Sequence, residues 1–354
     1  MKKKTVFVGM SGGVDSSVSA ALLKEQGYDV VGVFMKVWSP EWMPCLWPEE
    51  RRDAMRVAAV LDIPLLTFDF EKEYKQGVID YMIAEYRAGR TPNPDVMCNR
   101  EVKFGAFLKK ALSMGADAVA TGHYAQVREK NGVYELSAGK DQNKDQSYFL
   151  WTLTQTQLSK VLFPIGHLEK PRVRELAAKF SLPVAEKKDS QGLCFVGHVD
   201  IKDFLKRYID VVAGEVVNEQ GEVIGVHDGA TLYTIGERHG FLVAKKTPED
   251  KPYFITRKDV QNNRLVVSAD PLAEAAITDV LLEDMSWTHS VPSAGEKIYS
   301  ARVRYRQVLE ECRLIEINES SVLVRFTHPV RAVTPGQSLV LYEGDVCLGG
   351  GVIV

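Results

Sequence analysis

The stretch VFVGMSGGVDSSVSAALL, residues 6–23, joins a short apolar run to an amphipathic run through a glycine-rich turn. Residues 5–9 are typical of a buried strand, and the apolar residues after the turn recur at helical spacing. Gly12 and Gly13 have no Cβ, so the backbone can turn sharply and direct successive N–H groups at one anion. The N-terminus of the following helix adds donors and the positive end of a dipole. The stretch therefore predicts a strand, a phosphate-binding turn and a helix.

The polar side chains of this turn fit the same purpose. Ser11, Ser16 and Ser17 can donate hydroxyl hydrogen bonds to a phosphate. Asp15 would repel a phosphate directly, so we predict that it either caps the helix or holds a Mg²⁺ ion that the phosphates share. The alternative for the whole stretch is an ordinary glycine turn capped by serine.

The pattern of the turn separates it from two commoner phosphate loops. It contains no Gly-Lys-Ser/Thr, which excludes the P-loop of kinases and GTPases, and no G-x-G-x-x-G, which disfavours a dinucleotide-binding turn. The residues SGGVDS, 11–16, resemble the pyrophosphate loop of the N-type ATP pyrophosphatases. Those enzymes split ATP into AMP and pyrophosphate to activate a carbonyl oxygen, so the resemblance implies an ATP site.

Composition limits the class of protein. The chain has 354 residues, of which 45% are hydrophobic and 26% charged, as is usual for soluble globular proteins. No apolar run approaches the length of a membrane span, so we expect a cytoplasmic protein without a membrane partner. The formal net charge of -3 confines any contact with nucleic acid to local basic patches.

The five cysteines are spread widely and never form a C-x-x-C pair. This spacing argues against a disulfide scaffold and against a zinc finger, and it favours individual reactive thiols. A cluster held by Cys45, Cys98 and Cys194 is a less favoured alternative. Cys312 and Cys347 lie in runs with a β pattern, where we expect them to pack in the core.

Strand and helix patterns alternate over about the first 160 residues. After the first helix, which we expect to end at Gly27, the sequence predicts strands at 30–35, 63–70 and 116–121 and helices at 49–61, 74–87 and 103–113. Such alternation predicts a Rossmann-like α/β domain whose parallel sheet has helices on both faces. Ligands of these sheets bind at the carboxyl ends of the strands, here the loops at Met10, after Met35 and at Thr121.

The sequence pattern changes near residue 210. Beyond it, short β-patterned segments separated by glycines replace helical and charged segments. We interpret this part as two small β-barrel-like domains. The predicted domains are residues 1–205, with a helical extension from about 165, followed by 206–272 and 273–354.

The run RAGRTPNPDVMCNREVKF, residues 87–104, carries a candidate nucleophile. Pro92 and Pro94 favour an extended backbone, and Asp95 and Cys98 follow where a helix is predicted to start. A thiol at a helix N-terminus beside basic residues ionises more readily than an isolated one. The alternative is a loop cysteine that packs as a small hydrophobe.

A second candidate thiol, Cys194, lies in KKDSQGLCF, residues 187–195, just past a flexible basic loop. A cysteine on such a loop can collect a group elsewhere and deliver it. It can equally be a buried strand cysteine.

The run RVRYRQ, residues 302–307, has basic residues at every second position. On a strand, Arg302, Arg304 and Arg306 would point to one face, where they suit a phosphate backbone. Tyr305 would point to the other face and either stack on a splayed base or pack in the core. A solvated charged strand is the alternative.

Together these residues resemble the bacterial tRNA-specific 2-thiouridylases over nearly the whole chain. The shared motifs are GMSGGVDSS, GRTPNPDVMCN, ATGHYA, NKDQSYFL, FPIG, KKDSQGLCF, RVRYRQ, PVRAVTPGQS and VCLGGG. The resemblance implies an adenine nucleotide alpha hydrolase-like first domain with a tRNA-binding helical extension. It implies that sulfur replaces the 2-oxygen of the wobble uridine of tRNA, with ATP and Mg²⁺. The implied partners are the anticodon stem-loop of Lys-, Glu- or Gln-type tRNAs and a sulfur donor, either a cysteine desulfurase or a sulfur-relay carrier.

The resemblance also implies roles by position. For ATP it implies Gly9, Met10, Ser11, Gly12, Gly13, Val14, Asp15, Ser16, Met35 and Gly122. For the target base it implies Asn93, Pro94 and Asp95, and for other tRNA contacts His123, Lys144, Asp145, Gln146, Arg304, Tyr305 and Gln337. Cys98 is implied as a nucleophile and Cys194 as the carrier of a persulfide. A metal site at His123 is not expected, because no second histidine lies at ligand spacing.

The chemistry of the residues agrees with these implied roles. Adenylation turns the poor leaving oxygen of a pyrimidine carbonyl into AMP, and pyrophosphate departs into the glycine loop. The persulfide on Cys194 then attacks the activated carbon, or Cys98 attacks the persulfide and frees sulfide. Either route can leave Cys98 and Cys194 joined as a disulfide that must be reduced. Asp95 can accept a proton or orient the base.

The chain departs from this family mainly at VWSPEWMPCLWPEE, residues 37–50, where relatives have a more acidic and less aromatic loop. Gln191 replaces a threonine that many relatives carry. The alternative enzyme is an amidotransferase or ligase with the same pyrophosphate loop, but it would leave both thiols unused. A further alternative is an RNA-binding or sulfur-carrier protein with a vestigial ATP site.

Overall fold

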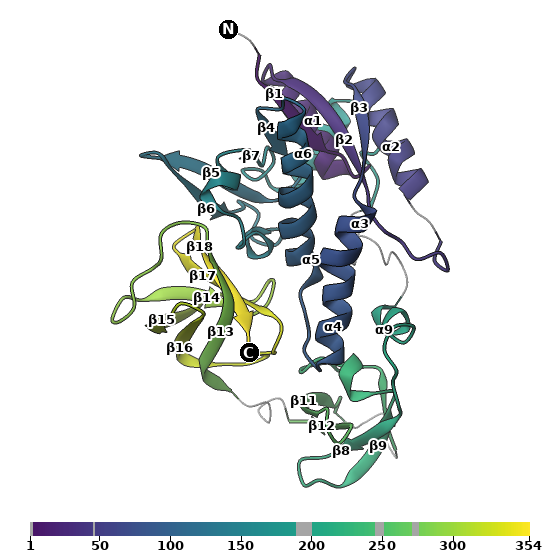
Figure 1. Cartoon of the computed structure of the whole chain (residues 1–354), viewed down its shortest axis with the longest axis vertical. Coiled ribbons are helices and arrows are strands. Elements are labelled where there is room, and N and C mark those ends of the chain that lie inside the picture. The colour runs from purple at the N-terminus through teal and green to yellow at the C-terminus, as the bar shows by residue number, and fades with distance from the viewer. Residues whose placement is uncertain (1–2, 45–46, 189–199, 245–250, 271–275) are drawn as a thin grey trace.

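The structure is a computed structural model that describes residues 3–44, 47–188, 200–244, 251–270 and 276–354. Figure 1 shows a parallel sheet near the N-terminus, a barrel at the C-terminus and a smaller sheet at the far end of the molecule, with long helical segments between them. Within the described residues, no helix combines the length and the apolar character needed to cross a membrane.

The first sheet contains five parallel strands in the order β3-β2-β1-β4-β7. Their bounds are β1 (Thr5–Gly9), β2 (Asp29–Lys36), β3 (Leu65–Asp69), β4 (Ala118–Ala120) and β7 (Val161–Leu162). The strand order reverses at β1, which pairs with β2 on one side and with β4 on the other. Open α/β sheets bind ligands at such a switch point. The predicted α/β domain with a parallel sheet is confirmed, and its glycine-rich turn lies at the switch point.

Helices cover both faces of this sheet. One face carries α1 (Val14–Glu25), α2 (Trp47–Val60) and α8 (Lys170–Lys179). Val6 and Val8 of β1 pack against these helices, whereas Phe7 belongs to the core on the opposite face, where its ring centre lies 6.4 Å from that of Phe68. Successive strand side chains point to opposite faces, so an apolar run without polar interruptions is what a sheet buried on both sides requires.

Two long helical segments extend from the sheet toward the other domains (Figure 1). One consists of α3 (Glu71–Tyr74), η1 (Lys75–Asp80) and α4 (Tyr81–Arg87), and the other of α5 (Pro94–Met97), η2 (Cys98–Phe107) and α6 (Leu108–Ser113). Both η1 and η2 are π-helical, a geometry that often marks functional sites. The second segment begins at Pro94, earlier than the helix predicted at 103–113. The remaining short helices are η3 (Ser147–Phe149), α7 (Gln155–Leu158), α9 (Ile201–Leu205) and η4 (Ala230–Leu232).

A β-hairpin interrupts the predicted alternation of strands and helices. It consists of β5 (Ala125–Lys130) and β6 (Val133–Ala138), and β6 pairs with β18 of the barrel. The extension of the alternating pattern to about residue 160 was therefore wrong. Asn131 and Gly132 both have positive φ values, 53 and 78. An Asn-Gly pair between two β-patterned runs is a strong local hairpin signal, so the sequence did contain the information.

The middle of the chain forms a sheet with the order β10-β9-β8-β12-β11. Its strands are β8 (Gly214–Val217), β9 (Val223–His227), β10 (Phe241–Val243), β11 (Phe254–Asp259) and β12 (Arg264–Ser268). This sheet packs against the end of α4, where a Cβ on Gly89 would lie 2.7 Å from Val260 Cγ2.

The C-terminal strands form a closed barrel, as predicted for the last part of the chain. They are β13 (Ile277–Trp287), β14 (Tyr299–Arg302), β15 (Glu310–Ile317), β16 (Ser321–Val330), β17 (Ser338–Glu343) and β18 (Val346–Ile353). Their order is β13-β16-β15-β14-β17-β18, and β13 pairs with β18 to close the ring. One edge of β18 is shared, because residues 349–353 face β13 and residues 346–347 face the β6 strand.

Candidate active site at the carboxyl edge of the parallel sheet

The loop after β1 has the geometry of an anion-binding turn. Gly12 has a φ of 72°, and a Cβ there would lie 2.4 Å from the carbonyl oxygen of Glu50, so glycine is required. The Ser16 hydroxyl accepts a hydrogen bond from the backbone N–H of Ser11 at 3.2 Å and donates one to the carbonyl of Gly13. No side chain caps the N-terminus of α1. Gly13 at the N-cap thus offers no side-chain acceptor for the N–H groups of the first turn, and such groups are where anions bind at helix N-termini.

Asp15, in the first turn of α1, is held by two side chains from distant parts of the chain. Lys170 Nζ donates to both carboxylate oxygens, at 2.7 and 2.9 Å, and the Tyr124 hydroxyl donates to one of them at 2.8 Å. Asp15 makes no cap bond, so the capping role predicted as one of two alternatives was wrong. Sequence reasoning missed Lys170, because it lies 155 residues from Asp15 and no local pattern links them.

A second lysine, Lys187, holds the loop after β1 through a backbone carbonyl. Lys187 Nζ donates to the carbonyl of Gly12 at 3.1 Å and to Asp53 at 2.8 Å. Burial raises the pKa of the nearby Glu50 carboxyl, although the charge of Lys187 opposes this shift. The residues 182–187 and Asp53 border an open cavity of about 510 Å³ beside this lysine. Lys187 thus satisfies a loop carbonyl and leaves the N–H side of the loop for a ligand.

The other residues implied for ATP come to the same edge. A Cβ on Gly9 would lie 3.0 Å from Met35 Cε, so the ends of β1 and β2 touch there. A Cβ on Gly122 would lie 2.7 Å from the backbone of Asp15 and Ser16. Only glycine allows the loop after β4 to pack this closely on the helix N-terminus. The structure therefore brings together the residues implied for the nucleotide.

His123 follows Gly122 and is buried. Its Nδ1 lies 2.7 Å from Thr121 Oγ1, and its ring lies 5.8 Å from the ring centres of both Phe104 and Phe163. Burial lowers the pKa of His123 well below its usual value, and the positive charge of Lys103 lowers it further. At neutral pH the imidazole is therefore uncharged and fixed between aromatic rings.

The candidate nucleophile lies near the start of the helical segment that runs from Pro94 to Ser113. The Asn93 side chain caps this segment by accepting a hydrogen bond from the N–H of Val96 at 3.3 Å. Cys98 follows α5 directly and is buried. Burial raises the pKa of the Asp95 carboxyl, and Lys103 partly offsets this shift. The same helical segment reaches the ends of β1 and β4, since a Cβ on Gly9 would lie 3.7 Å from Phe107 Cε1 and 3.7 Å from Thr121 Cγ2.

Asp145 and Gln146, both implied for tRNA, make side-chain contacts within the protein. Asp145 is 5% exposed, forms an ion pair with Arg302 and accepts hydrogen bonds from the N–H groups of Gly139 and Ser147. Gln146 Oε1 accepts a hydrogen bond from the N–H of Tyr124 at 2.9 Å. Lys144 is partly exposed.

The strand predicted for residues 302–307 was wrong beyond its first residue. Strand β14 ends at Arg302, which is buried, and Arg306 has a φ of 65°. Arg304 donates to the carbonyls of Ala332 and Ile235, so the three arginines do not form one basic face. A continuous ladder is incompatible with the left-handed backbone at Arg306.

Tyr305 is partly buried in an aromatic group. Its ring centre lies 4.5 Å from that of Phe149 and 6.3 Å from that of Tyr148. The guanidinium of Arg306 lies 5.1 Å from the Tyr305 ring centre. This arrangement leaves one aromatic ring at the surface beside a cation.

Gln337 reaches the segment that precedes the helix start. Its Nε2 donates to the carbonyls of Thr91 and Pro92, at 2.9 and 3.0 Å. Asn93 and Pro94 follow directly in the chain, so Gln337 is tied to the same region as Asp95 through the backbone.

The cysteines divide into three groups. Cys312 and Cys347 are buried in barrel strands, as predicted, and burial raises the pKa of each thiol to about 12. Cys98 lies at the candidate site. Cys45 and Cys194, like Gln191, lie outside the described residues. Among the residues that the structure does describe, no group of three or more His, Cys, Asp or Glu side chains could hold a metal ion.

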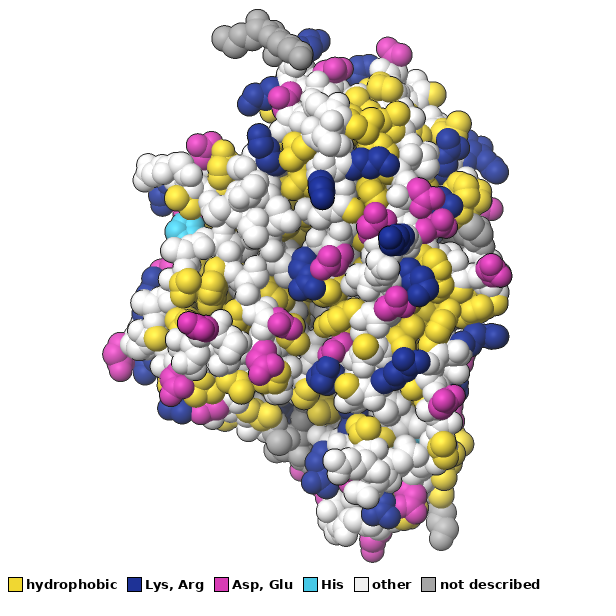
Figure 2. All heavy atoms as spheres, viewed as in Figure 1, with side chains coloured by type: hydrophobic (Ala, Val, Ile, Leu, Met, Phe, Trp, Pro, Cys, Tyr) yellow, Lys and Arg dark blue, Asp and Glu magenta, His cyan; other side chains and the backbone are white. Residues whose placement is uncertain are grey.

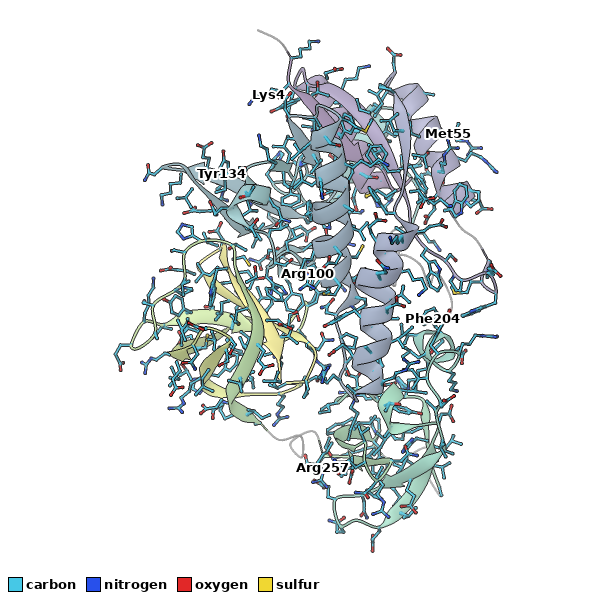
Figure 3. All side chains as sticks on the ribbon, viewed as in Figure 1. Lys4, Met55, Arg100, Tyr134, Phe204 and Arg257 are labelled. Carbon is cyan, nitrogen blue, oxygen red and sulfur yellow. The ribbon has the colours of Figure 1, made fainter. Side chains whose placement is uncertain are left out.

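The face shown in Figure 2 carries side chains of both charges. On the face in Figure 2, Lys and Arg side chains are interspersed with Asp and Glu. In Figure 3, Arg100 lies between the helical segments and the barrel, and Phe204 lies on the other side of α4.

Three family models together match almost the whole chain. They are described as the tRNA methyl transferase HUP domain (residues 4–198), the tRNA methyl transferase PRC-barrel domain (202–269) and the aminomethyltransferase beta-barrel domain (277–353). A tRNA-specific 2-thiouridylase of Nitrosomonas eutropha is 48% identical over 357 residues, which cover 100% of this chain and 99% of the relative. The chain belongs to the tRNA-specific 2-thiouridylase family. Another 2-thiouridylase, from Streptococcus mutans, is also 48% identical and covers 99% of this chain and 95% of its own length.

Two solved structures that resemble this 2-thiouridylase family member do so weakly. The U34-tRNA thiolase of Methanococcus maripaludis, solved with its [4Fe-4S] cluster, matches with a TM-score of 0.36 and 18% identity, over 58% of this chain and 67% of its own. The NMN synthetase of Francisella tularensis matches with a TM-score of 0.34 and 17% identity, over 57% of this chain and 71% of its own. Scores this low assign no function.

Proposed function

We propose that this chain is a tRNA-uridine 2-sulfurtransferase that uses ATP to replace the 2-oxygen of the wobble uridine of tRNA by sulfur. The observation that carries the proposal is the shared edge of the sheet. There the pyrophosphate loop at Gly12 packs beside the end of β4 at Gly122, and the helical segment that carries Cys98 reaches the end of β1 through Phe107. Membership of the 2-thiouridylase family over the full chain supports the same activity.

The loop side of the site suits the first half of the reaction. The uridine oxygen attacks the α-phosphorus of ATP, the bond to the β-phosphate breaks, and pyrophosphate leaves. In this proposal, the N–H groups of the loop and of the first turn of α1 bind the departing pyrophosphate. Lys187 and Lys170 keep the loop and its carboxylate in place, through Gly12 and Asp15.

A Mg²⁺ ion fits this site through few protein ligands. Mg²⁺ at nucleotide sites is usually bound by one or two carboxylates together with substrate phosphates and water. Asp15 is a carboxylate with a fixed orientation in the first turn of α1, which meets this requirement. The ion would neutralise negative charge on the phosphates. Asp15 is therefore the residue that would hold it.

The helix side of the site suits the sulfur step. The terminal sulfur of a persulfide on Cys194 bonds to the activated carbon and AMP leaves, after which Cys98 attacks the Cys194 sulfur and releases 2-thiouridine. Alternatively, Cys98 attacks first and frees sulfide, which then displaces AMP. Both routes end in a disulfide that needs a two-electron reductant. Asp95, with its raised pKa, is placed to accept or return a proton.

The proposed partners follow from this chemistry. The substrate is the anticodon stem-loop of a tRNA with a wobble uridine, which the family's named activity supports. The persulfide must be supplied by a protein that takes sulfur from cysteine, either directly or through a relay carrier. We expect these steps in the cytoplasm, where tRNA and ATP occur together.

The test is nucleoside mass spectrometry on unmodified tRNA after incubation with the protein, ATP, Mg²⁺, a cysteine desulfurase and a reductant. We expect sulfur in place of oxygen at the wobble uridine, and only with ATP. Cys98→Ser and Cys194→Ser should each abolish the thionucleoside while ATP and tRNA still bind. A fully active Cys194→Ser protein would refute the persulfide role. Absence of both thionucleoside and tRNA-dependent pyrophosphate would refute the proposed function.

A further inference from the structure

The C-terminal barrel forms hydrogen bonds with the segment that leads into the helix carrying Asp95 and Cys98. The Gln337 side chain donates to two consecutive carbonyls, those of Thr91 and Pro92, at 2.9 and 3.0 Å. In the same loop, the carbonyl of Pro335 accepts a hydrogen bond from the N–H of Thr91 at 2.8 Å. Thr91 therefore has both its backbone N–H and its carbonyl bound by the barrel, although it belongs to the first domain.

Gly336 makes this approach possible. It has a φ of 91°, and a Cβ there would lie 2.9 Å from both the nitrogen and the oxygen of Thr91. Real Cβ atoms do not approach backbone atoms so closely without a shift of one partner. Any other residue at 336 would thus push the barrel loop and the segment at Thr91 apart.

The middle domain also contacts Thr91, through the threonine side chain. Thr234 Oγ1 lies 3.3 Å from Thr91 Oγ1. Arg304 joins this domain to the barrel, since its guanidinium donates to the carbonyl of Ile235 at 2.7 Å and to Thr334 Oγ1 at 2.8 Å. Elements of both β domains therefore converge on one residue of the first domain.

Thr91 and Pro92, which the barrel binds, lie directly before the candidate active-site helix in the chain. Asn93 caps the helix that carries Asp95 and Cys98, and it follows Pro92 in the chain. A displacement of residues 91–92 would move the helix start with it. Reacting groups that are misplaced by about 1 Å can lose on the order of 100-fold in rate.

We propose that Gly336 and Gln337 are positioning residues for thiolation, through which the barrel sets the location of Asp95 and Cys98. This inference rests on the proposed function. It differs from a direct tRNA contact at Gln337, which would act on tRNA affinity. The contacts of Gly336 and Gln337 with residues 91–92 act instead on the turnover of tRNA that is already bound.

The decisive variant is Gly336→Ala, because it adds one methyl group against Thr91 and changes no side chain that could touch RNA. Gly115→Ala is the matched control. Gly115 has a φ of 90°, and its Cβ would meet no described atom within 4 Å, so it carries the same backbone strain without the contact. Both variants are compared with the wild type for kcat at saturating tRNA, for tRNA Kd and for hydrogen exchange in residues 91–98.

For Gly336→Ala we expect kcat to fall at least tenfold, tRNA Kd to stay within about twofold, and the amides of residues 91–98 to exchange faster. Gly115→Ala should match the wild type in kcat and in this exchange. A rise in Kd with unchanged kcat, or unchanged exchange at 91–98, would overturn the proposal. Because the wild type is measured in the same assay, its inactivity would instead count against the proposed function.

Gln337→Met keeps the length of the side chain but removes the donor to both carbonyls. It should reproduce the loss of kcat and the faster exchange. Suppose that Gln337→Met alters only the tRNA Kd and that Gly336→Ala alters neither kcat nor Kd. Gln337 is then a direct tRNA contact, and the contacts of the barrel with residues 91–92 have no role in turnover.

Discussion

Lys170 Nζ holds both oxygens of the Asp15 carboxylate, at 2.7 and 2.9 Å, across 155 residues of chain. The lysine side chain is 11% exposed and the aspartate side chain 31% exposed. A carboxylate in the first turn of α1 would by itself oppose a triphosphate. The paired lysine removes that opposition and keeps the carboxylate aimed in one direction.

Lys170→Met should therefore weaken ATP binding at least tenfold, because an uncompensated carboxylate would then face the phosphates. Calorimetric titration with ATP in the absence of Mg²⁺ measures this directly, because a bound Mg²⁺ would compensate the charge of Asp15 in place of the lysine. Lys179→Met is the control, since Lys179 lies at the exposed end of the same helix and pairs with Glu25 at 3.2 Å. Equal ATP affinity of the two variants would exclude this role for Lys170.

Asp145 gives a second prediction, on stability. Its side chain and that of Arg302 are 6% and 8% exposed, so removal of one charge leaves the other buried without its partner. We expect Asp145→Asn to lower the free energy of unfolding by about 3–5 kcal/mol. Asp345→Asn breaks the exposed pair with Arg128 and should cost about 0–1 kcal/mol. Urea denaturation of both variants measures these changes. Equal urea midpoints for Asp145→Asn and Asp345→Asn would show that the buried pair is not a stabilising contact.

Local sequence was sufficient for the elements around the pyrophosphate loop. The apolar run at 5–9 and the glycine turn produced β1 and α1 as predicted, and Gly27, with a φ of 89°, ends that helix. These features depend on residues close together in the chain, where periodicity and turn chemistry carry the information. A helix start was also expected around Asp95 and Cys98, where α5 begins at Pro94, but the helix predicted at 103–113 began too late.

Tertiary partners could not be predicted in this way. Nothing near Arg302 in the sequence distinguishes a buried partner of Asp145 from one of three exposed arginines on a strand. The same holds for Gln337, whose contact with Thr91 spans 246 residues. Such contacts depend on how domains meet, which no local pattern records.

Trp42 lies in the loop that follows β2. Its ring lies 6.0 Å from that of Phe204 in α9, and the Arg207 guanidinium lies 4.5 Å from its ring centre. The loop after β2 is therefore tied to the helix that follows the segment containing Cys194.

Trp42→Ala should lower the rate of thiolation about two- to fivefold, equivalent to the 0.5–1 kcal/mol of an exposed cation–π contact. Pyrophosphate formation with tRNA should be retained, because the pyrophosphate loop is not part of this contact. Trp42→Phe keeps an aromatic ring and is the control. If Trp42→Ala and Trp42→Phe thiolate tRNA at the same rate, the contact does not influence sulfur transfer.

His123 gives a prediction on pH. Burial holds its pKa in the folded protein well below the value of 6.5 expected for the unfolded chain. Below pH 6.5 the unfolded state therefore binds a proton that the folded state does not. The stability contributed by the neutral ring is present above pH 6.5 and is lost as the pH falls toward the folded pKa, by at most about 1.4 kcal/mol per pH unit.

The comparison is between the wild type and His123→Gln, whose side chain does not titrate. Thermal unfolding at pH 7.5, 6.5, 5.5 and 5.0 should show a steeper acid loss in the wild type, so that the difference in stability between the two proteins narrows as the pH falls. Other acid-sensitive groups are common to both proteins and cancel in this difference. A difference that stays constant from pH 7.5 to 5.0 would mean that His123 titrates as an exposed histidine does, in conflict with its place between Phe104 and Phe163.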